Sequence, residues 1–330
     1  MMNRVTDNEH SNTMSATDMT VDILLATYNG ERYLSEQIES ILNQTFSNFT
    51  LYIRDDGSTD STREIIAFYC AMDSRVRLII DDVNSNSVGR NFFELIKKST
   101  SEYVFFSDQD DVWLSTKVER SLSKIIGIQG PCLLYVNGEV VNESLERSSV
   151  NIYTSDGITS SFKNLLFYNG GLQGCATVAN RKLIDLVRDK DNIHWYMHDQ
   201  VLTFYAVAYG KIYFLNEVLF LYRQHASNVI GYQNKGYISA LISRCKGGAR
   251  GRSALLHKPS LDFIHSFYLS EGYKLKKQDD DLFNVFFSIL SANKFLAIFF
   301  IFRNNFTLKN SKTRLLLKSV FFKFQVKDLK

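Results

Sequence analysis

The sequence has 330 residues, of which 45% are apolar, 22% charged and 13% aromatic. This composition excludes disordered and collagen-like chains, because they lack the apolar side chains that build a core. The net charge of +3 is too small to indicate nucleic-acid binding, so we expect no nucleic-acid partner.

The four cysteines, Cys70, Cys132, Cys175 and Cys245, lie far apart in the sequence. They form no CxxC pair, so the sequence predicts neither a disulfide framework nor a zinc site. Reduced thiols of this kind are typical of cytosolic proteins. Residues 1–20 are polar, which predicts a flexible leader and no secretory signal. We therefore expect a cytoplasmic protein.

Short apolar runs alternate with helical spacings through the first part of the chain. The runs predict strands at Val21–Ala26, Leu51–Ile53, Val76–Ile80 and Tyr103–Phe106. Apolar residues three and four positions apart predict a helix after each strand. The second of these helices is expected to begin with a capping box between Ser61 and Glu64.

This alternation predicts an α/β fold, with a Rossmann-like, mostly parallel sheet and helices on both faces. Further strands are expected with fewer helices between them, at Cys132–Val141, Cys175–Ala179, Lys211–Leu215 and Val218–Tyr222. The sheet is therefore expected to become mixed in its second half.

The C-terminal part combines an apolar run with a basic tail. Residues 283–302 are strongly apolar but are interrupted by Lys294 and two asparagines. Residues 303–330 hold eight Lys or Arg against one acid, Asp328. Three interpretations of the run stay open: a segment lying in a membrane interface, a buried helical hairpin, or a membrane span. The basic tail favours the first, on an anionic membrane surface.

Two acidic loops follow predicted strands. One is Asp55-Asp56-Gly57-Ser58-Thr59-Asp60, and the other, Ser107 to Trp113, holds Asp108, Asp110 and Asp111. Carboxyl ends of parallel strands meet at one edge of a sheet, where ligands bind. Three close carboxylates repel one another unless a cation lies among them, and Mg²⁺ or Mn²⁺ prefers such oxygen ligands. Either loop alone has a plain turn as its alternative, but the two together favour a functional site.

Six segments in this order resemble the successive motifs of the inverting family 2 glycosyltransferases. They are ILLATYNGERYLSEQIESILNQTF, LYIRDDGSTDSTREI, VGRNFFELI, YVFFSDQDDVW, MHDQVLTFYAVAYGKI and LYRQHASNV. The SDQDDVW and RQH forms most resemble the rhamnosyltransferase-like branch of surface polysaccharide biosynthesis. The resemblance implies a GT-A catalytic domain over residues 21–230, followed by a C-terminal helical region with a basic amphipathic tail over residues 231–330.

The resemblance also implies roles for residues in the first two motifs. Thr27, Tyr28 and Asn29 would line the base pocket, although a plain turn is the alternative. Asp55 would accept the N3–H of uracil or thymine, a donor that cytosine lacks. Asp56 is expected to contact substrate beside it.

The next two motifs are expected to complete the donor site. Arg90 and Asn91 would finish the nucleoside pocket, with ordinary solvation of a helix N-terminus as the alternative. Asp108 would reach the ribose or the ion. Asp110 would bind the Mg²⁺ or Mn²⁺ that bridges the diphosphate.

The last motifs would supply the chemistry. Asp199 matches the general base of the family, and its alternative is a helix N-cap. Arg223 and His225 would oppose the charge of the leaving diphosphate, with His225 as a possible metal ligand. Gly174 and Cys175 resemble the loop near the donor sugar, although strand packing explains Cys175 equally well.

The sequence thus predicts a metal-dependent enzyme that moves one sugar from a nucleoside-diphosphate donor to a lipid-linked acceptor. Rhamnose from a dTDP donor is the preferred guess, and a hexose from a UDP donor is the next. The expected location is the inner face of the cell membrane, held peripherally. The alternatives are a catalytically silent nucleotide-sugar-binding scaffold and a sugar nucleotidyltransferase. The sequence argues against the nucleotidyltransferase, because no glycine-rich, lysine-bearing loop follows the first predicted strand.

Overall fold

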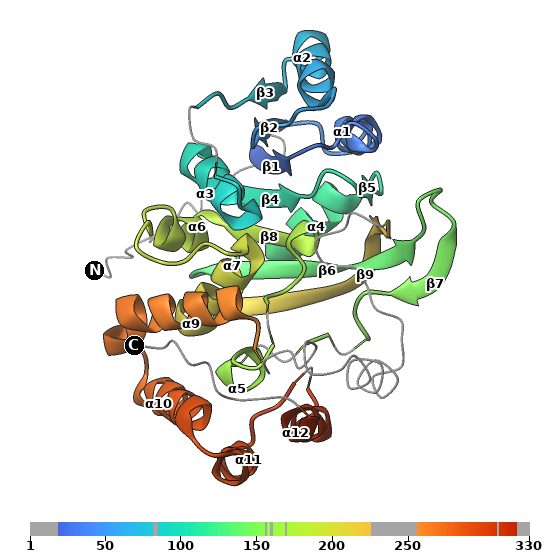
Figure 1. Cartoon of the computed structure of the whole chain (residues 1–330). Coiled ribbons are helices and arrows are strands. Elements are labelled where there is room, and N and C mark those ends of the chain that lie inside the picture. The colour runs from blue at the N-terminus through green and yellow to red at the C-terminus, as the bar shows by residue number, and fades with distance from the viewer. Residues whose placement is uncertain are drawn as a thin grey trace, which may run out of the picture.

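The computed structural model describes residues 19–81, 85–155, 157–158, 161–168, 170–225, 256–308 and 310–321. A nine-stranded sheet runs through this part of the chain, in the order β3-β2-β1-β4-β8-β6-β9-β5, with β7 paired to β6. Helices pack along the sheet, and the C-terminal helices lie at the end of the molecule away from β1, β2 and β3 (Figure 1). The leader predicted at residues 1–20 falls almost wholly outside the described residues.

The first half of the sheet is parallel, as predicted. Its strands are β1 (Val21–Thr27), β2 (Phe49–Asp55), β3 (Val76–Leu78) and β4 (Tyr103–Ser107). β1 pairs in parallel with β2 and with β4, so the ends of these three strands meet at one edge. Every residue of β4 is buried, which explains why it reads as a continuous apolar run.

The second half of the sheet is mixed, as predicted, because antiparallel pairs join it there. Its strands are β5 (Val112–Trp113), β6 (Cys132–Val141), β7 (Arg147–Asn151), β8 (Thr177–Asn180) and β9 (Lys211–Arg223). β8 is antiparallel to both β4 and β6, whereas β6 and β9 are parallel. β9 is a single strand where two were predicted, because its pairing with β6 continues across an irregularity in register between residues 136 and 138.

Seven helices accompany the described strands. They are α1 (Leu34–Leu42), α2 (Thr62–Met72), α3 (Val88–Lys98), α4 (Lys117–Ile125), α5 (Phe162–Leu165), α6 (Arg181–Val187) and α7 (His198–Tyr209). The predicted capping box of α2 is wrong, because the Ser61 side chain makes no capping hydrogen bond. Asp60 takes that place: its Oδ1 accepts from the Thr62 backbone N–H at 3.1 Å.

The C-terminal apolar run is divided between two helices. After α9 (Lys258–Glu271), the chain forms α10 (Lys277–Ser291), α11 (Lys294–Arg303) and α12 (Lys312–Phe321). Ala292 and Asn293 are extended, and the Asn293 side chain caps α11 by accepting from the Leu296 N–H at 3.0 Å. No helix in the described ranges is both long and apolar enough to span a bilayer.

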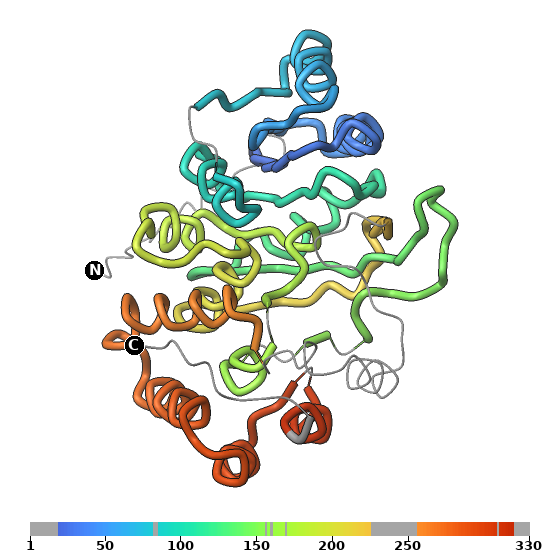
Figure 2. The backbone as a smooth tube through the Cα atoms, in the orientation of Figure 1, coloured from blue at the N-terminus to red at the C-terminus, as the bar shows by residue number. Residues whose placement is uncertain are grey.

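Aromatic side chains fasten these helices to the sheet domain. Phe162 of α5 packs against Phe204 of α7 and Phe283 of α10, with ring centroids 5.5 and 5.0 Å apart. Phe306 and Leu315, which belong to the predicted basic tail, are fully buried in the same continuous core. Figure 2 shows the chain from α9 to α12 (orange to red) at the end of the molecule opposite the blue N-terminal strands. The described part of the tail is therefore an integral part of the fold.

Candidate active site

Three carboxylates lie close together in the loop after β4. Burial, and then the charge of Asp110, raises the pKa of Asp108 to about 7. Burial and the charges of Asp110 and Asp108 raise the pKa of Asp111 well above its ordinary value. The loop therefore has an excess of negative charge that a cation would neutralise.

Lys117, at the start of α4, is a buried cation beneath this loop. It is 1% exposed, and its Nζ donates to the Cys175 carbonyl at 2.5 Å. The same Nζ lies 3.7 Å from the centroid of the Trp113 ring. Burial lowers the Lys117 pKa to about 7, although Cys175, Asp111 and Asp108 act in the opposite direction. The sequence analysis did not single out Lys117, because the apolar spacing of α4 carries no signal for a buried lysine.

Asp110 faces the end of β9, as its predicted role requires. Its Oδ2 lies 2.8 Å from Nε2 of His225. Their side chains are 16% and 7% exposed, so both lie close to the surface of the site without projecting into bulk solvent. The structure thus brings together the two residues that were predicted, 115 positions apart, to hold a metal.

Arg223 is buried and holds the acidic loop in place. Its Nε donates to the Asp110 carbonyl at 2.9 Å, and its backbone N–H donates to Asp111 Oδ1 at 3.2 Å. Its guanidinium also pairs with Glu36 of α1 and lies over the Tyr33 ring, 4.6 Å from the centroid. These contacts show Arg223 positioning the loop; its predicted contact with the leaving diphosphate stays a prediction.

Asp199 is the second residue of α7. It is 8% exposed, and its Oδ1 accepts from the Gln200 N–H at 2.6 Å. Burial raises its pKa to about 7; the Gln200 hydrogen bond acts against this, and the negative charge of Asp108 adds to it. Asp199 is therefore within electrostatic reach of Asp108 and titrates near neutral pH. Such a carboxylate is suited to accepting a proton from a hydroxyl. The N-cap alternative fails, because Met197 is the N-cap of α7.

Two glycines let the backbone approach the start of α7. A Cβ at Gly171 would come within 2.3 Å of the Asp199 carbonyl oxygen. A Cβ at Gly174 would come within 2.3 Å of Nε2 of His198. His198 is buried, and its ring lies 3.7 Å from that of Phe92. Gly174 thus packs against the residue that precedes Asp199, and larger side chains would push the two segments apart.

The residues predicted to line the base pocket lie at the end of β1. Tyr28 is 55% exposed, and its backbone is clamped by Gln109, which accepts from its N–H at 2.9 Å and donates to its carbonyl at 3.0 Å. Asn29 has φ 48°, and its N–H donates to Ser58 Oγ at 2.8 Å. Thr27 is buried. The first and fourth loops are therefore tied together by a side chain, Gln109, that sequence reasoning did not select.

Asp55 and Asp56 differ in what their carboxylates contact. Asp55 accepts from Arg63 Nε at 2.8 Å and from the Ser58 N–H at 3.0 Å. Burial acts to raise the Asp55 pKa, but these hydrogen bonds outweigh it and lower the pKa. Asp56 is 5% exposed and accepts from the N–H and hydroxyl of Ser85 at 2.7 and 2.8 Å. Its contacts indicate that it anchors the segment before α3, in contrast to the substrate contact expected from the sequence.

Arg90 and Asn91 also point in different directions. Asn91 is buried, and its Oδ1 accepts from Arg54 Nη1 at 3.0 Å. Its Nδ2 donates to the Thr27 carbonyl at 3.3 Å, so it joins α3 to the end of β1. Arg90 pairs with Asp191 at 2.8 Å near the surface. The structure thus places Asn91, but not the Arg90 guanidinium, against the residues at the end of β1.

Two sets of side chains could supply ligands for a divalent cation. Ligand atoms of Asp108, Asp111 and Cys175 lie within 4.8 Å of one another. Burial raises the pKa of the Cys175 thiol well above its ordinary value, which disfavours the thiolate that metals need. Asp110 and His225 offer a carboxylate and an imidazole nearer the surface, and this set fits Mg²⁺ or Mn²⁺ better.

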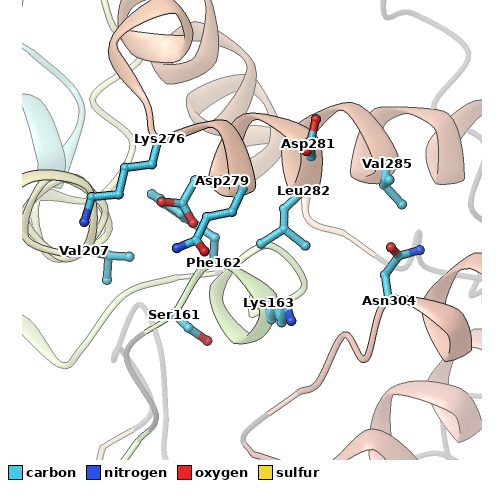
Figure 3. A pocket seen from close by; sticks show the side chains of 11 residues that line it. Ser161, Phe162, Lys163, Val207, Lys276, Asp279, Asp281, Leu282, Val285 and Asn304 are labelled. Atoms are coloured by element: carbon cyan, nitrogen blue, oxygen red, sulfur yellow. The ribbon is translucent and has the colours of Figure 1, made fainter.

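A separate cavity of about 570 Å³ lies between α5, α7 and α10 (Figure 3). Phe162, Lys163, Asp279 and Leu282 are among its lining residues. None of the predicted site residues is among the described residues that line it, so we do not connect it with the carboxylates.

Comparison with known proteins favours one of the functional classes. The family model described as "Glycosyl transferase family 2" matches residues 22–178, which contain the first four motifs and the acidic loop. Residues 22–178 therefore hold a glycosyltransferase family 2 domain. This domain and the relatives described next support a glycosyltransferase, and the sugar nucleotidyltransferase alternative is set aside.

Named relatives agree with this family. The chain is 29% identical over 232 residues to the dTDP-rhamnosyl transferase RfbG of Shigella flexneri, covering 63% of this chain and 73% of the relative. It is 32% identical over 129 residues to an Escherichia coli protein, UDP-Glc:alpha-D-GlcNAc-diphosphoundecaprenol beta-1,3-glucosyltransferase WfgD. That alignment covers 38% of this chain and 49% of the relative, so the chain matches about half of its length.

A solved structure confirms the fold of this glycosyltransferase. Residues 1–349 of TarS from S. aureus, in complex with UDP-GlcNAc, superpose with a TM-score of 0.52 at 15% identity. The superposition covers 91% of this chain and 89% of that one. The GT-A-type arrangement predicted from the sequence is thereby confirmed.

Proposed function

We propose that this glycosyltransferase moves one sugar, with inversion, from a nucleoside-diphosphate donor to a lipid-linked glycan in polysaccharide biosynthesis. The observation that carries the proposal is the placement of Asp199: it is nearly buried, lies within electrostatic reach of Asp108, and has a pKa of about 7. A base of that pKa is half ionised at neutral pH and still strong enough to accept a proton.

In the proposed reaction the acceptor hydroxyl oxygen attacks the anomeric carbon of the donor sugar. Asp199 takes the hydroxyl proton, a new C–O bond forms, and the bond to the diphosphate breaks with its electron pair leaving on the nucleoside diphosphate. Asp110 and His225 would hold Mg²⁺ or Mn²⁺, which supplies positive charge at the diphosphate when bound. Arg223 keeps the Asp110 loop in position through its hydrogen bonds to that loop.

The donor and the acceptor are proposed from the named relatives. RfbG is a dTDP-rhamnosyl transferase, which favours dTDP-rhamnose as donor, and WfgD uses a UDP-hexose, which makes UDP-glucose the second candidate. The name of WfgD also includes a diphosphoundecaprenol acceptor. We therefore propose a polyprenyl-diphosphate-linked saccharide as acceptor and the cytoplasmic face of the membrane as the place of reaction.

A panel of donors tests this function directly. The purified chain is incubated with dTDP-rhamnose, UDP-glucose and UDP-GlcNAc, with Mg²⁺ or Mn²⁺ and a polyprenyl-diphosphate saccharide, and the released nucleoside diphosphate is measured. We expect release with one donor at a rate that falls by a factor of about 10² or more in Asp199→Asn. Tight donor binding without release from any donor would instead support the silent scaffold.

A further inference from the structure

Helix α11 exposes an unusually apolar face. Phe295, Phe299 and Phe302 are 88%, 51% and 60% exposed. On the opposite side of the helix, Ala297 and Ile301 are fully buried. We call the exposed side the α11 face, and it consists of Phe295, Leu296, Phe299 and Phe302.

The spacing of these residues makes them one continuous stripe. Positions 295, 299 and 302 are separated by four and three residues, which places them on the same side of a helix. A group of neighbouring apolar side chains exposed to water often marks an interaction surface, whereas a single exposed apolar residue is common and does not. At 1.5 Å per residue the ten residues of α11 span about 15 Å, about half the thickness of a bilayer core. A membrane-bound α11 would therefore lie parallel to the membrane.

Positive charges surround the α11 face. Lys294 and Arg303 stand at the two ends of the helix and are exposed. In α12, Nζ of Lys312 lies 3.8 Å from the centroid of the Phe302 ring. Arg314, two residues further along α12, is exposed. The sequence holds no Asp or Glu between residues 294 and 321. Aromatic rings edged by cations match the boundary between acyl chains and anionic headgroups.

Helix α11 is held in place by contacts on the side opposite the α11 face. The Asn293 side chain caps α11, and α10 beneath it buries Phe283, Phe286 and Ile289 in the core. Phe306, just after α11, packs against Phe167 with ring centroids 5.3 Å apart. The exposed rings thus project from a helix that is held on its other side.

We propose that the α11 face docks this enzyme flat onto an anionic lipid bilayer, with its rings in the interface and the adjacent Lys and Arg on the headgroups. A second copy of the chain is a poorer occupant, because a symmetric contact would bring like charges of two copies together. The proposal rests on the proposed function only in that a lipid-linked acceptor would be met at such a surface.

Vesicle sedimentation of the full chain tests the docking. Vesicles of phosphatidylcholine with about 30% phosphatidylglycerol, which carry a negative surface potential, are compared with vesicles of phosphatidylcholine alone. We expect the double variant Phe295→Ser, Phe299→Ser to lower the partition coefficient on anionic vesicles about tenfold or more. Both side chains face solvent, so the variant should fold.

A matched control removes exposed apolar residues elsewhere. Phe68 and Met72 of α2 are 57% and 69% exposed, and α2 lies at the opposite end of the molecule (Figure 1). The double variant Phe68→Ser, Met72→Ser should bind vesicles like the unsubstituted chain.

In a second experiment, the tryptophan emission of Phe299→Trp should shift to the blue with anionic vesicles, whereas that of Phe68→Trp should not. The native tryptophans, Trp113 and Trp195, are buried and provide a constant background.

The outcomes separate this proposal from the proposed function, because vesicle binding needs neither donor nor turnover. Equal vesicle binding by the α11 double variant and the unsubstituted chain would overturn the docking, and so would the absence of binding to any vesicle. A concentration-dependent dimer in lipid-free buffer that the α11 double variant abolishes would assign the face to a second copy. Release of nucleoside diphosphate, measured on the same proteins, reports separately on the active site.

Discussion

Asp199 owes its predicted reactivity to its position at the start of α7. It is 8% exposed, Gly171 packs against its backbone carbonyl, and the charge of Asp108 disfavours a second ionised carboxylate. A raised pKa means that Asp199 is protonated, and so unable to act as a base, below about pH 7.

The raised pKa of Asp199 predicts how the rate of sugar transfer depends on pH. Since the ionised form of Asp199 is the active one, kcat should fall about tenfold per pH unit below its pKa of about 7 and level off above it. Initial rates between pH 5 and 9, at saturating donor and metal, measure this. A rate independent of pH from 5.5 to 8 would contradict Asp199 as the base.

The same raised pKa predicts a change in stability. The pKa of Asp199 is higher in the fold than in the unfolded chain, so ionisation destabilises the fold; this penalty is absent at low pH and complete above about pH 7. Asp199→Asn should therefore raise the free energy of unfolding by on the order of 2 kcal/mol at pH 8 and by less at pH 5. Urea unfolding measures it, with the exposed Asp189→Asn as control. A destabilised Asn variant at pH 8 would refute the assignment.

At the scale of single residues, the sequence predicted which side chains could carry the chemistry better than it predicted which side chains touch each other. The order of motifs was enough to predict the pair Asp110 and His225, because each follows a recognisable strand. Asp56 was predicted to contact substrate, which stays a prediction, and its hydrogen bond with Ser85 is one that no local pattern indicates. Lys117 and Gln109 were missed for the same reason: their partners are distant in the sequence.

At the scale of elements, Arg54 joins several segments around the end of β2. It is 1% exposed and pairs with Asp81 at 2.7 Å and with Asp56 at 3.3 Å. It also donates to Asn91 of α3 at 3.0 Å. The segment before α3 and the helix itself are thus fixed by one buried cation.

Removing this cation should be far more damaging than removing a partly exposed one. Arg54→Met leaves the Asp56 carboxylate buried without its positive partner, so we expect a loss of about 3–5 kcal/mol in the free energy of unfolding. Arg75→Met, which breaks a partly exposed pair with Asp73, should lose about 1 kcal/mol or less. Urea titrations of both variants give the comparison. Equal losses would show that Arg54 does not organise this region.

Elements with a strong apolar period were predicted, and those without one were not. β1, β2 and β4 are buried runs, whereas the two residues of β5 and the exposed β7 have no period to recognise. The apolar run of residues 283–302 looked continuous, but Asn293 caps a new helix within it. Part of the run is therefore core, as in the buried hairpin interpretation, and α11 is left half exposed.

At the scale of the whole molecule, one sheet edge and one helix start supply all the predicted chemistry. The ends of β1, β2 and β4 carry the loops expected to hold the donor, β9 brings Arg223 and His225 to the same loops, and α7 presents Asp199. These segments are distant in the sequence, and only the strand order that places β9 two positions from β8 unites them. Periodicity gives no strand order, and the family resemblance was used only to predict a GT-A-type sheet, without stating which strands are neighbours.

The central claim is that Asp110 and Asp199 serve one site in different roles, and paired measurements of donor binding and turnover test it most directly. Asp199→Asn should bind the nucleoside-diphosphate sugar in the presence of Mn²⁺ as tightly as the unsubstituted enzyme, and lose turnover by a factor of about 10² or more. Asp110→Asn should lose the Mn²⁺-dependent part of donor binding itself. Equal loss of binding in both variants, or undiminished turnover in Asp199→Asn, would contradict the account.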